Sequence, residues 1–418
     1  MTTTGAPTTE VLRDRQFGPF FVGNLLSNSG TWFHNIAAAA VIYQATGSSL
    51  LVGLVSVLQF VFVIVLAPFA GGLTDRIDRR RLLLGTQVVS LAAAVGLAVG
   101  ASRIDITVDP RGVPLVLAAT AVLGLSHGLA MPAMSALVAN LVRDDQLETA
   151  VALNSVTFNL ARALGPIAGG VTFTTFGPVT AFAANAGSFV ALVVALLVIR
   201  PRTGVADGTR RRPFTEALRF VWRDRVAFVV LVTLAAMSFA GDPVNTLTPA
   251  LADRFGRGPE AIGQQVSAFG LGSAAVLVVL GRLRTRIGSA RAGVLGVAAV
   301  GAGMLLVAAS PTYVVALVAL AVAGAGFLVG VSLLTGVLHR RLDERLRGRV
   351  MALWSVAFLG ARPVGAAVNG AVADRVGVVP AVVVAGTVAL VALGWAGRRL
   401  WHTPGATPEP PATVPGSR

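Results

Sequence analysis

The chain has 418 residues, of which 55% are hydrophobic and only 13% are charged, and its mean hydropathy is +0.76. Soluble globular chains carry about 25% charged residues, so this composition excludes an ordinary soluble domain. There is no cysteine, which excludes disulfides and thiolate chemistry. The net charge of +15 does not indicate nucleic acid, because all 34 basic residues are arginines and they gather in particular loops.

Apolar runs of about 20 residues recur along the chain, and this is the length that crosses a bilayer. We therefore predict an all-α integral membrane protein with twelve transmembrane helices. The expected spans are residues 17–44, 50–74, 82–101, 113–139, 149–173, 178–199, 226–250, 261–281, 289–309, 312–338, 349–373 and 377–400.

A polar stretch at residues 200–225 divides these helices into two bundles of six, at 17–199 and 226–400. Within this linker, "PFTEALRFVW" has the pattern of a short amphipathic helix lying on a membrane face. The N-terminal segment 1–16 precedes the bundles. The Pro-rich tail 401–418 follows them and is expected to be disordered.

The arginines are distributed unequally between the two sides of the predicted bundle. Of the 34, 27 lie in the termini and loops of one side, five on the other side and two within spans. The five are Arg103, Arg111, Arg254, Arg257 and Arg375. By the positive-inside rule both termini are predicted to be cytoplasmic. Arginine without lysine is typical of a GC-rich bacterial genome, so we expect a multi-pass protein of the bacterial cytoplasmic membrane, in contact with its lipids.

The first predicted helix carries a polar stripe at spacing i, i+4, i+7 and i+11. The stripe consists of Asn24, Asn28, Thr31 and Asn35. A stripe of this length favours the lining of a cavity, and packing against a partner helix is the alternative. His34 lies beside the stripe. Gln59 and His127 are single polar positions in the second and fourth helices, suited either to an interhelical hydrogen bond or to ligand contact.

The loop "GGLTDRIDRRR", residues 71–81, joins the second and third predicted helices. Its arginines, Arg79 and Arg80 among them, fit the charge topology alone. The carboxylate of Asp75 at a helix end needs a partner, however, and Gly71 and Arg76 flank it.

The fifth predicted helix contains "NLARALGPIAGG", residues 159–170. Arg162 lies about 13 residues into a helix of about 25, near the bilayer centre, where a charge costs about 2.5–3.5 kcal/mol. It must therefore face water, an anion or carbonyl groups, and Asn159 lies on the same face. The small residues that follow suit either close helix packing or a kink. They are Gly165, Pro166, Gly169 and Gly170.

Asp242 is the one acidic residue that lies embedded in a predicted span. A carboxylate within a membrane segment is a natural proton carrier. The sequence "GDPVNT" also fits a helix that restarts with Asp242 as N-cap and Pro243 at the first helical position. Both interpretations stay open, and Asn245 in the same segment is a candidate for lining the cavity.

An internal repeat relates the two halves of the chain. An offset of 200 residues pairs 152–170 with 352–370 at nine identical positions, and Arg162 thereby pairs with Arg362. An offset of 210 pairs 71–81 with 281–291. Both matches run in the same sense relative to the membrane, which indicates parallel repeats about an axis along the membrane normal. That architecture is typical of secondary transporters.

The loop at 71–81 resembles the signature loop of the major facilitator superfamily, G-x-L-x-D-R-x-G-R-R/K, with Asp78 where glycine is common. An opening "W…YQ-TGS" and the segment "ALNS…FNLAR-x-x-GP-x-x-GG" resemble its branch of drug and siderophore exporters, which includes the enterobactin exporter. The resemblance implies that Asp75 and Arg76 form a latch between the halves on the cytoplasmic side. It also implies that Gly-Pro-x-x-Gly-Gly marks an exporting antiporter.

These observations predict a secondary transporter, and not an enzyme, that is driven by the proton gradient without cofactor or metal. It would export a drug, siderophore or secondary metabolite as a monomer, and Asp242, with His34 or His127, would exchange a proton for this small-molecule substrate. Import of a small organic solute and a non-transporting receptor or scaffold are the alternatives. ATP-driven pumping is excluded because the chain has no G-x-x-x-x-G-K-[ST] loop.

Overall fold

The computed structural model describes residues 7–107, 109, 111–200, 215–342 and 344–401. Side chains at 67–76, 135, 144, 158, 159, 162, 163, 215, 344, 345, 347 and 348 lie outside this description. Within the described residues every regular element is a helix, which confirms the predicted all-α class.

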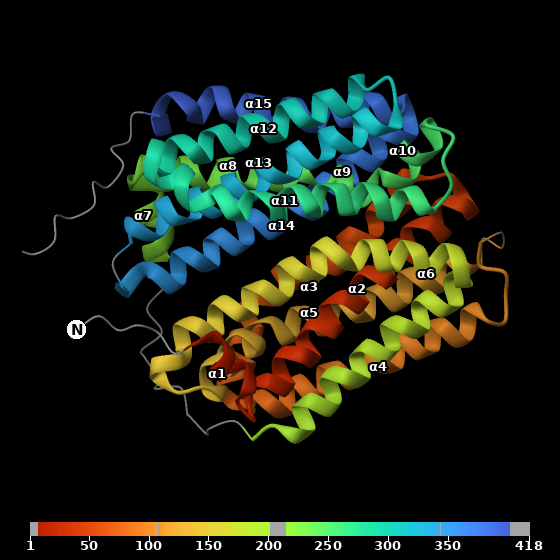
Figure 1. Ribbon diagram of the computed structural model, residues 1–418, viewed down its shortest axis with the longest axis horizontal. Helices are drawn as coiled ribbons and strands as arrows, with labels where there is room; N and C mark the ends of the chain where they lie inside the picture. Colours follow the sequence, from red (N-terminus) through yellow and green to blue (C-terminus); the bar gives the residue numbers. More distant parts are fainter. Residues whose placement is uncertain (1–6, 108, 110, 201–214, 343, 402–418) are drawn as a thin grey trace, which may run out of the picture.

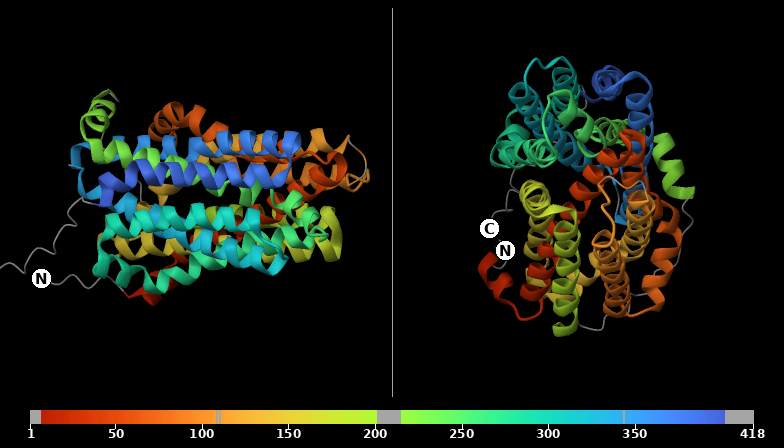
Figure 2. Two further views of the ribbon diagram at one scale, coloured as in Figure 1. Left: turned by 90° about the horizontal axis from the view of Figure 1, so that it is seen from above. Right: turned by 90° about the vertical axis from the view of Figure 1, so that its right-hand side faces the viewer.

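The helices form two bundles that lie against each other along a shared axis (Figures 1 and 2). The first bundle comprises α1 (Thr8–Arg13), α2 (Phe17–Thr46), α3 (Ser49–Arg76), α4 (Arg79–Ala101), α5 (Gly112–Leu141), the 3-10 turn η1 (Asp144–Gln146) and α6 (Leu147–Val198). The second comprises α7 (Thr215–Arg223), α8 (Arg225–Gly241), α9 (Pro243–Thr246), α10 (Thr248–Arg254), α11 (Glu260–Ile287), α12 (Ser289–Ala309), α13 (Tyr313–Arg340), α14 (Glu344–Val376) and α15 (Val378–Trp401).

The two ends of this molecule differ in character. We call the end that carries α1, α7 and the turn between α3 and α4 the arginine-rich end. We call the other end, where α2 turns into α3 and α14 turns into α15, the opposite end. Because α3 runs toward the arginine-rich end and α14 runs away from it, these two helices are antiparallel.

Ten helices of the described residues are long and apolar enough to cross a membrane. They do not include α2, in which polar residues interrupt the apolar run, and α6 is counted once although it bends at Gly177 (φ 80°, ψ 177°). A positive φ of this kind suits glycine, and Pro178 follows it directly. The chain is thus a multi-pass membrane protein, while the count of twelve spans stays a prediction.

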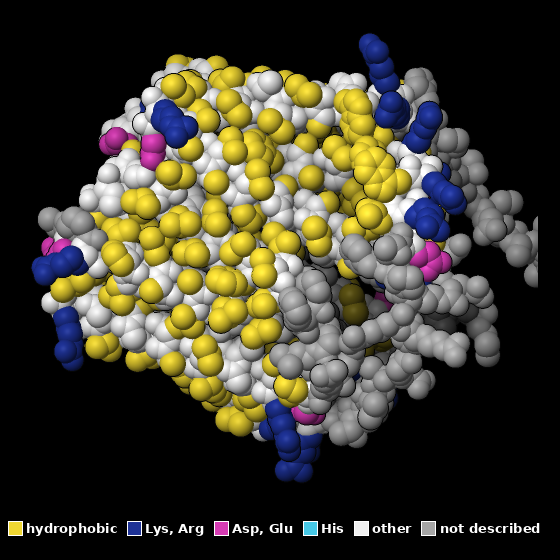
Figure 3. Space-filling model, turned by 180° about the vertical axis from the view of Figure 1, so that it is seen from behind, with side chains coloured by type: hydrophobic (Ala, Val, Ile, Leu, Met, Phe, Trp, Pro, Cys, Tyr) yellow, Lys and Arg dark blue, Asp and Glu magenta, His cyan; other side chains and the backbone are white. Residues whose placement is uncertain are grey.

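The outer surface matches a lipid environment. Hydrophobic side chains cover the middle of the face in Figure 3, and arginine side chains lie toward its edges. Large apolar side chains point outward, such as Phe176 at 66% and Val278 at 80% exposure. A continuous apolar surface of this size would be penalised in water and is stabilised in a bilayer.

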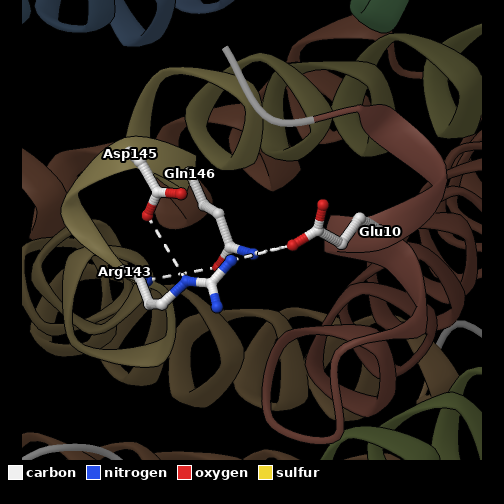
Figure 4. A network of polar contacts seen from close by, with 4 residues as sticks. All are labelled: Glu10, Arg143, Asp145 and Gln146. Carbon is white, nitrogen blue, oxygen red and sulfur yellow. Dashed lines mark hydrogen bonds and ion pairs between the residues drawn. The ribbon is translucent and has the colours of Figure 1, made fainter.

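A small polar network ties α1 to the segment before α6 at the arginine-rich end (Figure 4). Glu10 accepts from Arg143 at 2.8 Å and from Gln146 at 3.3 Å, and Arg143 also lies 3.4 Å from Asp145. The amphipathic helix expected in the linker is α7, in which Trp222 is 67% exposed and stacks on Phe228. The two short helices α1 and α7 lie together at the arginine-rich end of the bundles.

Candidate functional site

Two helix pairs form most of the contact between the bundles: α3 packs on α14, and α6 packs on α11. We call them the α3–α14 seam and the α6–α11 seam. In the 200-residue repeat, the α6 segment of the second pair matches the α14 segment of the first. The two seams are therefore related by the pseudo-symmetry of the chain, and most predicted site residues lie along them or beside them.

Asp242 lies where α8 ends and α9 begins, and it is 1% exposed. Its side chain does not cap α9, although Pro243 occupies the first helical position as expected. The side chains of Thr246 and Asn369 lie beside the carboxylate, yet the geometry of neither is that of a hydrogen bond, so among the described residues both oxygens of Asp242 lack a hydrogen-bond partner.

This arrangement favours one of the two interpretations of Asp242. A buried carboxylate without hydrogen bonds is costly in its ionised form, and the cost is relieved when a proton binds. The N-cap interpretation requires a hydrogen bond from the backbone of α9, and the structure shows none. Asn245, one turn along, is half-buried.

Gly365 on α14 explains how the second bundle brings its helices together at Asp242. A methyl group on Gly365 would lie 3.1 Å from the Asp242 Cβ and 3.2 Å from the Phe239 Cα, so a side chain there would require α8 or α14 to shift slightly, and glycine permits this close approach. On the same face of α14, Asn369 follows one turn later and is fully buried.

Arg362 lies on α14 about one turn before Gly365. Its guanidinium Cζ is 4.9 Å from the ring centroid of Phe60 on α3 and 6.0 Å from that of Phe358. It is also close enough to Asp242 for the two charges to interact. Arg362 therefore contacts the other bundle by a cation–π interaction and faces the buried carboxylate of its own bundle.

The polar stripe of α2 is divided between packing and accessible space. The Asn24 amide donates to Asn154 on α6 at 2.9 Å, and Asn28 donates back to Asn24 at 2.9 Å. Thr31 is exposed, and its hydroxyl donates to the Ser27 carbonyl of its own helix. The first two residues thus join α2 to α6, as the packing alternative expects.

The remaining predicted polar residues of the first bundle have distinct surroundings. Gln59 donates a short hydrogen bond to Asn35, which joins α3 to α2. His34 is 1% exposed, and its Nε2 lies 3.0 Å from the Thr120 hydroxyl, so it belongs to the core of the first bundle. His127, halfway along α5, is exposed.

The small residues of α6 pack on both bundles. Methyl groups on Gly165 and Gly169 would meet Trp32 at 2.6 Å and the Phe33 Cα at 3.2 Å, both on α2. A methyl group on Gly170 would lie 3.1 Å from the Cα of Gly263 on α11, and one on Gly263 would lie 2.6 Å from the Pro166 carbonyl oxygen. The α6–α11 seam therefore depends on this motif.

The structure does not describe the surroundings of several predicted site residues, which are Gly71, Asp75, Arg76, Asn159 and Arg162. Of the other loop residues, Arg79 opens α4. Arg80 donates to the carbonyls of Leu196 and Leu197 at 2.5 and 2.8 Å, so it joins α4 to the end of α6 within the first bundle.

The sequence analysis missed the role of Asp374, the third residue from the end of α14. This carboxylate accepts hydrogen bonds from Ser48, Ser49 and Leu50 at the start of α3. An Asp-Arg pair stands at or near the end of both helices, Asp75-Arg76 in α3 and Asp374-Arg375 in α14, but this pair does not indicate which residues Asp374 contacts. The analysis also missed Asn154, Thr246 and Asn369, which carry no pattern of their own.

Residues 6–403 match a family described as transmembrane secretion effectors. Curated relatives include macrolide efflux protein A of Streptococcus pyogenes, 22% identical over 376 residues that cover 87% of this chain and 90% of the relative. Another is the multidrug efflux pump Tap of Mycolicibacterium fortuitum, 26% identical and covering 84% and 88%. A third is the enterobactin exporter EntS of Salmonella typhimurium, 27% identical and covering 85% and 84%.

A solved structure, that of the nucleoside transporter NupG, superposes with a TM-score of 0.74 at 9% identity and covers 92% of this chain and 99% of its own. At this identity the likeness concerns the fold alone. It agrees with two bundles of membrane helices around a central seam.

Proposed function

Because the chain belongs to the transmembrane secretion effectors, a family of major facilitator superfamily transporters, we propose that it is a proton-driven antiporter that exports a bulky apolar or amphipathic compound. The family and its macrolide, multidrug and enterobactin relatives support the efflux direction. They are also the reason to place the substrate among drugs, siderophores and secondary metabolites. The chain is a transporter and not an enzyme.

The observation that carries the proton-driven part is the buried carboxylate of Asp242. It lies between α8 and α14 without a hydrogen bond from the described residues and faces the charge of Arg362. When the bundles part, Asp242 would gain access to water and bind a proton. When they close again, the neutral side chain would tolerate burial, and Arg362 would lose its counter-charge.

The proposed orientation follows the arginines. The arginine-rich end would face the cytoplasm, and the turns at the opposite end would face the exterior. Substrate would enter between the bundles from the cytoplasm and leave after the opposite end opens. The proton would travel the other way through Asp242.

Purified protein in vesicles with an imposed pH gradient tests the proposal, with a labelled macrolide and enterobactin as probes. Asp242→Asn should lower gradient-driven transport by about tenfold or more, because the amide cannot carry the proton. Exchange of labelled for unlabelled compound without a gradient should persist. The matched control is Asp253→Asn, an exposed carboxylate on α10, which should leave both activities unchanged.

Unchanged gradient-driven transport in Asp242→Asn would remove this residue from the coupling. The direction of transport has its own readout in intact cells. Accumulation of the labelled compound, relative to a host without the protein, would establish import of an organic solute instead of export.

A further inference from the structure

The first turn of α3 is capped by a residue from the other bundle. The Asp374 Oδ1 accepts from the Ser49 amide at 2.6 Å, and its Oδ2 accepts from the Ser48 hydroxyl at 2.6 Å and the Leu50 amide at 3.2 Å. The Ser48 hydroxyl accepts in turn from the Leu51 amide at 3.2 Å. Asp374 therefore satisfies amide groups that a helix N-terminus otherwise leaves to water.

This cap is a connection between the bundles and not a local feature. The partners are separated by more than 320 residues, and Asp374 and Ser48 lie on opposite sides of the α3–α14 seam. Among pairs of described residues, every hydrogen bond that crosses from one bundle to the other ends on Asp374. Within the described part of the chain, the polar connection between the bundles thus lies at the opposite end.

Among the glycines that the structure describes in the α3–α14 seam, those at the opposite end have the closest contacts. A methyl group on Gly370 would lie 2.7 Å from the Leu50 Cα, and one on Gly53 would lie 2.6 Å from the Ala366 carbonyl. Farther toward the arginine-rich end, Gly360 meets only the tip of Ile64, at 3.4 Å. At these glycines, α3 and α14 are therefore in backbone contact near the opposite end and in side-chain contact farther from it.

We propose that Asp374 is the latch that holds the opposite end closed, and that breaking its cap on α3 accompanies the opening of that end. The inference rests on the proposed alternation between two open states. If the bundles separate at this end, Asp374 and the first turn of α3 part, and the charge-assisted hydrogen bonds are lost. Since the bonds exist only in the closed arrangement, they shift the equilibrium toward it.

In the α6–α11 seam, no described carboxylate of one bundle accepts a hydrogen bond from the other. The residue that matches Asp374 in the 200-residue repeat is Thr174, whose hydroxyl donates to the Gly170 carbonyl of its own helix at 3.0 Å. The latch is therefore present in the α3–α14 seam and has no counterpart at the matching position of the α6–α11 seam. Thr174 also supplies a matched control.

The absence of cysteine allows spin labels to be placed on introduced pairs. Ser102 and Pro311, both exposed, report the separation of the bundles at the opposite end, and Arg81 and Arg286 report it at the arginine-rich end. Asp374→Ala should lengthen the first distance and shorten the second. The ratio of open to closed populations at the opposite end should rise by about five- to tenfold, the usual effect of losing a helix cap.

Two further variants separate this effect from general damage. Ser48→Ala removes one of the three bonds from the partner helix and should shift the distances in the same direction by less. Thr174→Val should leave both distributions unchanged. Distances that stay unchanged in both Asp374→Ala and Ser48→Ala would overturn the latch.

The readout does not depend on transport. If Asp242→Asn leaves transport coupled, the proposed proton site fails while the distance shift still stands. If Asp374→Ala does not shift the distances, the latch fails whatever the coupling ion is.

Discussion

The side chains around Asp242 concentrate charge at a place where the two bundles also touch. Arg362 contacts the Phe60 ring across the α3–α14 seam and interacts with the Asp242 charge within its own bundle. Thr246 and Asn369 complete a buried polar group in which hydrogen bonds are missing. Under the proposed function, a change of charge at Asp242 would therefore act on a residue that contacts the other bundle.

Arg362→Ala should lower the export of every substrate by a similar factor, about tenfold, because the variant removes a cation–π contact and a counter-charge and not a substrate contact. Efflux of three chemically unrelated compounds from intact cells measures this. The repeat predicts the same result for Arg162→Ala. Arg375→Ala, an exposed arginine on the same helix, is the control, and loss of one substrate alone would contradict the prediction.

The residue scale also shows where sequence reasoning was sufficient and where it was not. Asp242 could be selected because an acid inside an apolar run is rare. Asp374 could not, because acids are ordinary at helix ends and its partners lie more than 320 residues away. Asn369 and Thr246 look like any other polar residue in a span until α14 is packed against α8.

At the scale of helices, periodic apolar runs were enough to predict the elements, since the bilayer imposes their length and spacing. The sequence did not predict which helices meet. Glycine spacing decides this: α6 approaches α2 through Gly165 and Gly169 and approaches α11 through Gly170. The Gly-Pro motif thus shapes a contact between the bundles. From the sequence alone, the motif was compatible with either a kink or close helix packing.

Gly263→Ala should destabilise the α6–α11 seam. Its added methyl group would lie 2.6 Å from the Pro166 carbonyl, so one helix must move. Gly187→Ala is the matched control, because nothing lies within 4 Å of its added methyl group and alanine favours the helix by up to about 1 kcal/mol. Thermal unfolding in detergent should show a lower midpoint for Gly263→Ala and an equal or higher one for Gly187→Ala. Equal midpoints would argue against a tight seam.

At the scale of the whole molecule, pseudo-symmetry and its exceptions together describe the transporter. The repeat supplies two equivalent seams, and two features break the equivalence: Pro166 is present only in α6, and Asp374 only in α14. Both seams therefore have close backbone packing, and the carboxylate cap of Asp374 is added in the α3–α14 seam. Because of this difference, the two seams need not separate in the same way, whereas an exact repeat would make their separation equivalent.

The orientation of the molecule in the membrane leads to a final prediction. The termini and loops of one side carry 27 arginines and those of the other side carry five, which predicts that the arginine-rich end lies in the cytoplasm. Single cysteines test it cleanly, because the chain has none of its own. Arg257→Cys, after α10, should react with a membrane-impermeant maleimide in intact cells. Arg223→Cys, in α7, should react only after the cells are permeabilised. Labelling of Arg223→Cys in intact cells would show that the arginine-rich end faces the exterior, and the directions assigned to substrate and proton would then be wrong.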